Sequence, residues 1–165
     1  MTESAGIRAV VSGFLLAGVL VTTMPCVSAY AEDAKARCVR TGDDDQVRPL
    51  PGSLILAARR MFEIPAATAD ADVRTTTAFR CMKGAVWLCS YGANLVCDKA
   101  DASRVSPGAD QFCKQNPGST SIPMSATGHA TVYDWTCAGT QARVVRQVTD
   151  VDARGFIAGN WKQLP

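Results

Sequence analysis

Six cysteines follow position 31, and their number and spacing are the clearest chemical signal in the sequence: Cys38, Cys81, Cys89, Cys97, Cys113 and Cys137. Structural zinc sites and dithiol redox centres use close pairs such as C-x-x-C. The sequence contains no such pair, and its one histidine is His129. An even number of cysteines in an exported chain instead predicts disulfides. We therefore expect three disulfide bonds, no metal site and no cofactor.

The stretch VWLCSYGANLVC favours one particular pairing. If Gly92-Ala93-Asn94 forms a three-residue turn, residue 91 faces residue 95 and Cys89 faces Cys97. Cysteines that face each other in a non-hydrogen-bonded pair have a separation that a disulfide tolerates. We predict a Cys89–Cys97 bond, and the pairing of the other four cysteines stays open.

His129 lies in the segment SATGHATVYDW, and it is the one residue that suggests acid–base chemistry. With Asp134 and a nearby serine (Ser119, Ser121 or Ser125) it would make a hydrolase triad. However, no G-x-S-x-G motif marks a nucleophile. We therefore favour a binding role for His129 and its neighbours Thr127 and Tyr133, with a small hydrolase using His129 as the alternative.

Two further groups have both a structural and a functional interpretation. The run Asp43-Asp44-Asp45 offers oxygen ligands for calcium, but it lacks the alternating spacing of a calcium loop. A solvated acidic loop is the preferred interpretation. Trp87, Trp135 and Trp161 are expected to fill the core, with contact to a carbohydrate by one of them as the alternative.

The N-terminus has the pattern of an export signal. Arg8 precedes the apolar run AVVSGFLLAGVLV, and the small-x-small sites VSA and AYA follow it. This run is short for a membrane span, which needs roughly 20 apolar residues. We predict a signal peptide over residues 1–31, with a retained anchor or a lipid-modified Cys26 as alternatives, and no membrane span after its cleavage.

The remaining chain is long enough for one domain with a modest core. The full sequence carries a net charge of +2, and the expected signal peptide contributes one acid and one base. This balance argues against a nucleic-acid partner.

Local patterns predict two helices and several strands. One helix is expected within residues 50–65, with Ser53 as its N-cap, and the other within 106–117, with Ser106 as N-cap. Residues 66–76 are expected to form a loop. Strands are expected over 77–82, 85–91 and 95–97, as a hairpin over 130–148, and over 155–164.

These elements predict an α+β fold: a small antiparallel sheet of about four or five strands with two short helices and three disulfides. A small all-β barrel is the alternative. Residues 32–49 are polar and are expected to be loose, with Cys38 as a tether, and residues 50–165 are expected to form a single disulfide-stabilised domain.

Three segments, GANLVCDKADAS, TGHATVYDWTC and VDARGFIAGNWKQL, resemble parts of small exported bacterial disulfide proteins that have no assigned activity. The resemblance extends over about residues 38–163. It implies a location in the cell envelope and assigns no catalytic residues.

The segment Thr127-Gly128-His129-Ala130-Thr131 is also similar to the Ser-Gly-x-x-Tyr loop of periplasmic c-type lysozyme inhibitors. Threonine stands at the serine position and Thr131 at the tyrosine position, with Tyr133 two residues later. This resemblance implies a loop that enters the lysozyme cleft.

Taken with the missing catalytic motifs, these patterns predict a non-catalytic binding module in the periplasm or outside the cell. Its partner is an envelope protein, a glycan or a small ligand. A lysozyme-inhibitor-like protein is an alternative.

Overall fold

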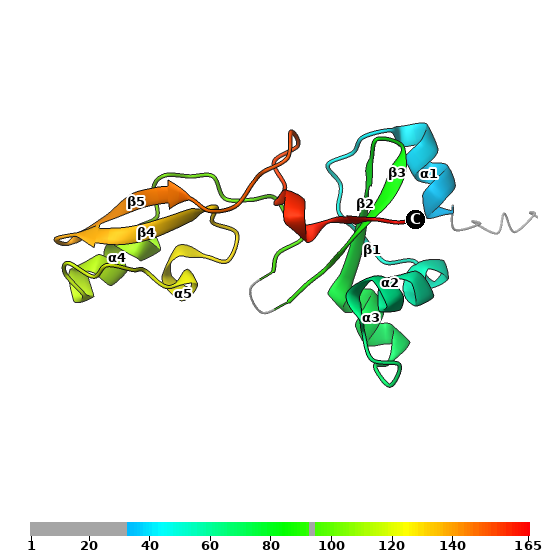
Figure 1. The fold of residues 1–165 in the computed structure, drawn as a ribbon, viewed down its shortest axis with the longest axis horizontal. Coiled ribbons are helices and arrows are strands. Elements are labelled where there is room, and N and C mark those ends of the chain that lie inside the picture. The colour runs from blue at the N-terminus through cyan, green and yellow to red at the C-terminus, as the bar shows by residue number, and fades with distance from the viewer. Residues whose placement is uncertain (1–32, 93–94) are drawn as a thin grey trace, which may run out of the picture. The chain divides into compact units, whose positions relative to one another are not determined.

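The computed structural model describes residues 33–92 and 95–165. Within them the fold is mixed α+β, with five α-helices, two small antiparallel sheets and three disulfides (Figure 1). The predicted α+β class is confirmed. The alternative of a closed barrel is wrong, because the strands form one four-stranded and one two-stranded sheet.

The larger sheet is built around one hairpin. Strands β2 (Thr77–Met82) and β3 (Ala85–Ser90) pair in register through a tight turn at Lys83 and Gly84, whose φ angles are +53° and +73°. The short strands β1 (Arg48–Pro49) and β6 (Lys162–Gln163) lie at the two edges, which gives the order β1-β2-β3-β6.

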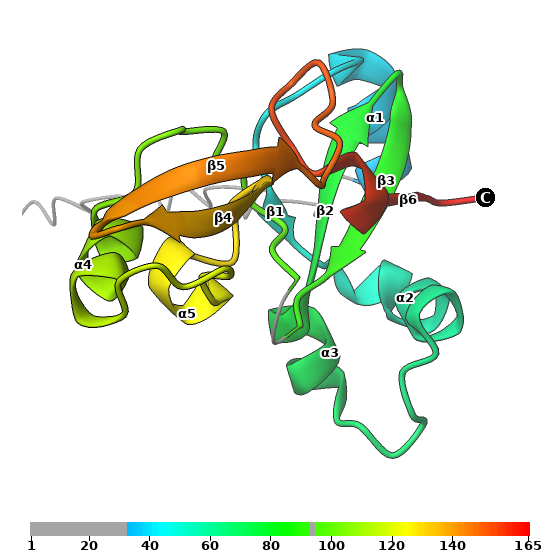
Figure 2. The ribbon, with the colours of Figure 1, turned by 60° about the vertical axis from the view of Figure 1, so that its left-hand side comes forward.

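Alternate residues of this hairpin point into two different cores. Phe79, Cys81, Val86 and Leu88 belong to a helix-side core. It also contains residues of α1 (Ala34–Thr41), the 3-10 helix η1 (Gly52–Leu54), α2 (Ile55–Phe62) and α3 (Asp70–Thr76). Figure 2 shows α2 and α3 beside this sheet.

The other face of the hairpin forms a loop-side core. Its members are Ala78, Cys89, Cys97, Phe156 and Trp161. Phe156 and Trp161 lie on either side of the 3-10 helix η2 (Ala158–Asn160) in the sequence, so the segment before β6 covers the middle of this face. Arg80 lies on the same face and is fully buried.

The second sheet has its own core. Strands β4 (Tyr133–Ala138) and β5 (Gln141–Gln147) form the predicted hairpin, with a register shift at Asp134/Trp135. Helices α4 (Pro107–Gln115) and α5 (Met124–Thr127) contribute to the same hairpin core, which consists of Ala109, Cys113, Ile122, Trp135 and Cys137. The predicted cap of α4 is present, because the Ser106 hydroxyl accepts a hydrogen bond from the Ala109 amide at 3.2 Å.

Each core contains one disulfide. Cys38–Cys81 lies in the helix-side core, Cys89–Cys97 in the loop-side core and Cys113–Cys137 in the hairpin core. The predicted Cys89–Cys97 bond is therefore confirmed, with a Cα–Cα distance of 5.8 Å. The predicted register is wrong, because Gly92 rather than residue 91 pairs with Leu95, while residues 93–94 of the proposed turn lie outside the described residues.

Several local predictions need correction. Residues 32–49, expected to be loose, contain α1 and β1, and residues 66–76, expected to be a loop, contain α3. Ser53 lies within η1 and makes no capping hydrogen bond for α2. The expected single sheet is two sheets. Tertiary contacts explain the two missed helices, since α1 is fixed by the disulfide of Cys38 and α3 by the fully buried Val73.

None of the helices in the described residues is long and apolar enough to cross a membrane. The predicted signal peptide over residues 1–31 lies outside the described residues.

Candidate functional site

The three residues predicted to bind a ligand lie close in sequence but in different settings. Thr127 is the last residue of α5 and is buried, His129 is exposed in the turn that follows, and Tyr133 begins β4 half-buried. Thr127 and Tyr133 line one cavity of about 250 Å³, which His129 does not line. The structure therefore brings together two of the three.

Asp134 and one of the three candidate serines of the suggested triad, Ser119, have other partners. The Asp134 carboxylate pairs with Arg146 Nε at 3.0 Å, across the β4–β5 hairpin. The Ser119 hydroxyl donates to the Ser121 carbonyl at 2.8 Å. These contacts give His129 neither an orienting carboxylate from Asp134 nor a nucleophile from Ser119.

The acidic run after α1 organises the surrounding loops. Asp43 accepts a hydrogen bond from the Lys83 amide at 3.1 Å, and Asp44 pairs with Arg48 at 2.5 Å. Asp45 bridges two cations on distant segments, Lys99 at 2.7 Å and Arg154 at 2.5 Å. The three neighbouring carboxylates thus point to different partners.

These partners also set the acidity of the run. Hydrogen bonds from Lys99 and Arg154 lower the pKa of Asp45. Burial raises the pKa of Asp44, but the hydrogen bonds from Arg48 and the Gln46 amide outweigh it and the net shift is downward. Within the described residues, no group of three or more histidine, cysteine, aspartate or glutamate side chains is placed to hold a metal ion.

Two of the three tryptophans fill the core, as predicted. Trp135 and Trp161 are buried, in the hairpin core and the loop-side core. Trp87 is half-buried and lines a cavity of about 420 Å³ with Met82, Lys83 and Asp152. Its indole Nε1 donates to the Met82 carbonyl at 3.2 Å.

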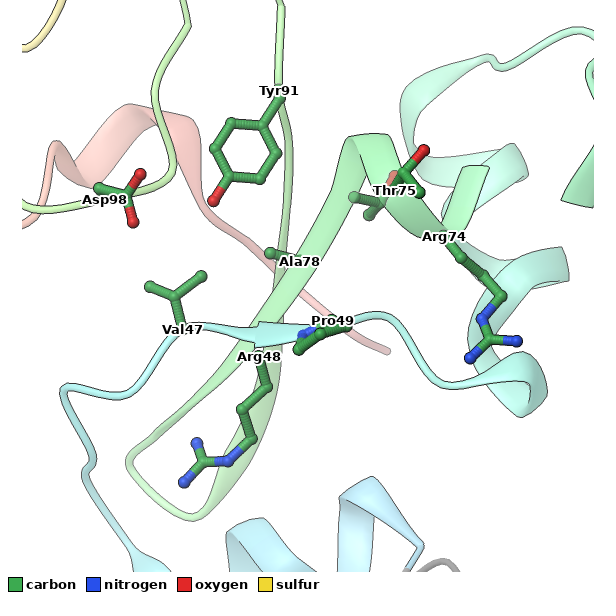
Figure 3. A pocket seen from close by; sticks show the side chains of 9 residues that line it. Val47, Arg48, Pro49, Arg74, Thr75, Ala78, Tyr91 and Asp98 are labelled. Carbon is green, nitrogen blue, oxygen red and sulfur yellow. The ribbon is translucent and has the colours of Figure 1, made fainter. Parts of the chain in front are cut away.

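A further cavity of about 400 Å³ lies at the end of the larger sheet, beyond the loop-side core (Figure 3). We call it the β1 groove. Arg48, Thr75 and Thr77 contribute to its wall, and six residues supply its floor and ends: Val47, Pro49, Arg74, Ala78, Tyr91 and Asp98.

The register of the sheet explains the apolar floor. Pro49 pairs with Ala78, and Ala78 pairs with Cys89, so these residues share one face. Val47 and Tyr91 lie two positions from Pro49 and Cys89, and their side chains therefore point to the same face. Arg48 is on the opposite face, with its guanidinium carbon 6.0 Å from the centroid of the Phe79 ring.

Helix α3 and a disulfide position the polar residues of the β1 groove. Arg74 is in the last turn of α3, and the Tyr91 amide donates to the Thr76 carbonyl at 2.7 Å, which holds Tyr91 near the end of that helix. Asp98 directly follows Cys97, whose bond to Cys89 attaches it to β3. In Figure 3 the Tyr91 hydroxyl points into the space between Asp98 and Val47, and Arg74 lies on the other side of the view.

Polar groups in the lining residues of the β1 groove have few partners within the described residues. The Thr77 hydroxyl is buried and has no hydrogen bond there. Among the described residues, Arg74 and Asp98 form no ion pair or hydrogen bond, although both are exposed. Burial, followed by the negative charge of Asp98, raises the pKa of Tyr91, so its hydroxyl stays protonated at neutral pH. Thr77 alternates with Ala78 along β2 and therefore lies on the face of Phe79 and Cys81, so its buried hydroxyl is not part of the groove floor.

Sequence reasoning did not identify the β1 groove. Val47 and Pro49 belong to the segment expected to be loose, and Arg74 to the expected loop. The alternation of Val47, Arg48 and Pro49 is a weak strand signal that could have placed Val47 and Pro49 on one face.

No protein-family model matches this chain, and no similar protein was found among curated proteins or among solved structures.

Proposed function

We propose that this protein is an exported, non-catalytic binding module that takes a small ligand in the β1 groove. One observation carries the proposal: a cavity of about 400 Å³ has an apolar floor and, among the described residues, two unpaired charges of opposite sign in its lining, Arg74 and Asp98. A ligand that meets both charges and covers the floor would form charge-assisted hydrogen bonds and bury apolar surface.

Three features support a binding role over catalysis. The six cysteines after position 31 are joined in disulfides, so they supply no thiolate nucleophile. The raised pKa of Tyr91 disfavours the phenolate that a general base would need. Asp134 and Ser119 have other partners than His129.

The three disulfides indicate an oxidising environment outside the cytoplasm. With the predicted signal peptide over residues 1–31, they support a periplasmic or secreted location.

The segment 127–131, which is similar to the lysozyme-inhibitor loop, is a less favourable site. Its end positions Thr127 and Thr131 are both buried, and the Thr131 hydroxyl accepts a hydrogen bond from Trp135 Nε1 at 3.1 Å. A loop that inserts into a cleft must project its side chains, and here the ends of the segment pack inward. An assay of c-type lysozyme with and without the protein tests this alternative directly.

The proposal is tested by adding the low-molecular-mass fraction of an envelope extract to nitrogen-15-labelled protein and recording amide chemical shifts. We expect shifts confined to the β1 groove in the wild type. Tyr91→Phe keeps the aromatic ring but removes the hydroxyl that points into the cavity. This variant is expected to weaken ligand binding by the loss of one hydrogen bond, about 1 kcal/mol.

Matched variants at the other cavity provide the control. His129→Ala and Tyr133→Ala are expected to leave the shifts in the β1 groove unchanged. If these variants abolish binding while Tyr91→Phe and Tyr91→Ala do not, the ligand site is the 127–133 segment and the proposal is wrong.

A further inference from the structure

We infer that the ligand of the β1 groove is a short peptide with free termini, whose α-ammonium group binds Asp98 and whose α-carboxylate binds Arg74. This inference rests on the proposed function and adds to it the chemical class and the orientation of the ligand.

The placement of the two charges is the first argument. Asp98 and Arg74 line the same cavity, and Figure 3 shows them on opposite sides of it, with Val47, Ala78 and Tyr91 between them. A ligand with a single charge would pair with one of these two groups and leave the other unmatched or be repelled by it. A zwitterion whose charges lie at its two ends matches both.

The second argument is that these two charges have no protein partners, whereas comparable nearby charges do. Arg48 pairs with Asp44, and Arg59 pairs with Asp70 at 2.8 Å. Arg74 and Asp98 are free within the described residues, so a ligand can bind them without breaking an existing ion pair. A guanidinium group also matches a carboxylate in a two-bond geometry.

The third argument concerns the middle of the ligand. Between the charged ends, the floor of Val47, Pro49 and Ala78 offers an apolar surface, while the Tyr91 hydroxyl offers a hydrogen bond. A peptide has the same composition, because amide groups alternate with side chains along it. A volume of about 400 Å³ is near the lower end of the range for small-ligand sites, roughly 300–1,000 Å³, and it suits a peptide of about two or three residues.

The test uses one tripeptide, Ala-Leu-Ala, in four forms: with free termini, N-acetylated, C-amidated, and blocked at both ends. Binding of each form is measured by amide chemical shifts up to millimolar concentrations, against wild-type protein and the variants Arg74→Gln and Asp98→Asn. Arg60→Gln and Asp150→Asn remove exposed charges of the same sign outside the β1 groove and serve as matched controls.

The expected pattern pairs each variant with one terminus. Arg74→Gln should weaken the binding of the two peptide forms with a free carboxylate by about twofold to fivefold, as expected for an exposed ion pair. The affinity of the two amidated forms should stay the same. Asp98→Asn should have the same effect on the two forms with a free ammonium group. Both effects should shrink at high salt, and neither control variant should show them.

The possible failures separate this inference from the proposed function. If the doubly blocked peptide binds as tightly as the free one, or if no peptide form shifts the β1 groove while the envelope fraction does, the inference is wrong and the proposed function stands. If neither the peptides nor the envelope fraction shift the β1 groove, both are wrong.

Discussion

Replacing Asp152 with asparagine tests the ion pair that lies inside the loop-side face of the larger sheet. Arg80 is fully buried there, and its Nη2 donates to a carboxylate oxygen of Asp152 and to the Met82 sulfur. The guanidinium carbon is 4.0 Å from the centroid of the Phe156 ring and 4.8 Å from that of Trp161. Within the part of the chain that the structure describes, Nε and Nη1 of Arg80 have no hydrogen-bond partner, so Asp152 provides most of the compensation for the buried charge.

The magnitude follows from the burial of the two partners. Breaking a buried ion pair by removing one partner destabilises a protein by about 3–5 kcal/mol, because it leaves an uncompensated charge. The Asp152 side chain is 16% exposed, which lets water reach the position, and we therefore expect a loss near the lower limit, about 3 kcal/mol. Asparagine keeps an oxygen for the Phe156 and Arg154 amides, which lie 3.0 and 2.9 Å from the carboxylate. The substitution thus removes the charge and the acceptor of Arg80 Nη2 while it keeps the two backbone hydrogen bonds.

Arg80→Met provides the complementary variant. It removes the buried cation and keeps a long apolar side chain between the two rings. It leaves Asp152 partly hydrated and still hydrogen-bonded to backbone amides. We expect this variant to lose only about 1–2 kcal/mol, through the cation–π contacts and the ion pair. The double variant should then be more stable than Asp152→Asn alone.

Urea unfolding with the disulfides intact, followed by tryptophan fluorescence, measures all four proteins in a double-mutant cycle. The reasoning is refuted if Asp152→Asn loses less than about 1 kcal/mol, or if Arg80→Met is the more damaging single substitution. Either result would mean that Arg80 is stabilised by its aromatic neighbours and not by Asp152.

Three further predictions concern pH, packing and cross-links. The pKa values of Asp44, Asp45 and Asp152 are lowered in the folded protein. The three carboxylates therefore stabilise the fold fully above the ordinary pKa of 3.8, and this stabilisation is lost as the pH falls through their lower folded values. Urea titrations below about pH 4 should show the loss, which should be smaller in Asp152→Asn. Gly108→Ala should lower the free energy of unfolding by about 1–3 kcal/mol, because a Cβ there would lie 2.2 Å from a backbone oxygen of α5, and an unchanged melting temperature would contradict this contact. Replacing both cysteines of one bridge with alanine should lower the free energy of unfolding by about 4 kcal/mol for Cys38–Cys81, about 3.4 for Cys113–Cys137 and about 2.5 for Cys89–Cys97, because the sequence separations are 43, 24 and 8. A reversed order of these losses, measured by calorimetry, would exclude loop entropy as their main cause.

Local sequence signals were sufficient where a structure depends on neighbouring residues. Ser106 and Pro107 predicted the start of α4, and the eight-residue spacing of Cys89 and Cys97 predicted their bond. The hairpin over 130–148 followed from alternation around a glycine turn.

The remaining elements depend on distant contacts. Helix α1 buries only Ala34 and Cys38, and the residue bonded to Cys38 is 43 positions away. Strand β1 exists because it pairs with Phe79 and Ala78 of β2, which no local pattern of two residues can indicate.

The β1 groove was missed for the same reason. Its lining comes from β1, the end of α3, β2, and the chain on both sides of residues 93–94. None of these segments carries a motif by itself, and the property that distinguishes the site, two unpaired charges of opposite sign at one apolar floor, is visible only once the chain is folded.

The order of the disulfides along the chain affects how the protein can acquire them. Of the six cysteines after position 31, the first is bonded to the second, the third to the fourth and the fifth to the sixth. In a chain that is exported N-terminus first, the first cysteine of each pair therefore finds its partner in the next cysteine to appear. Oxidation in order of appearance then gives the native set of disulfides without reshuffling. Cys26 precedes all six, and sequential oxidation that began with it would join it to Cys38 and shift every later pair. Oxidation in order of appearance thus gives the native pairs only if Cys26 is removed or kept out of reach before Cys38 appears.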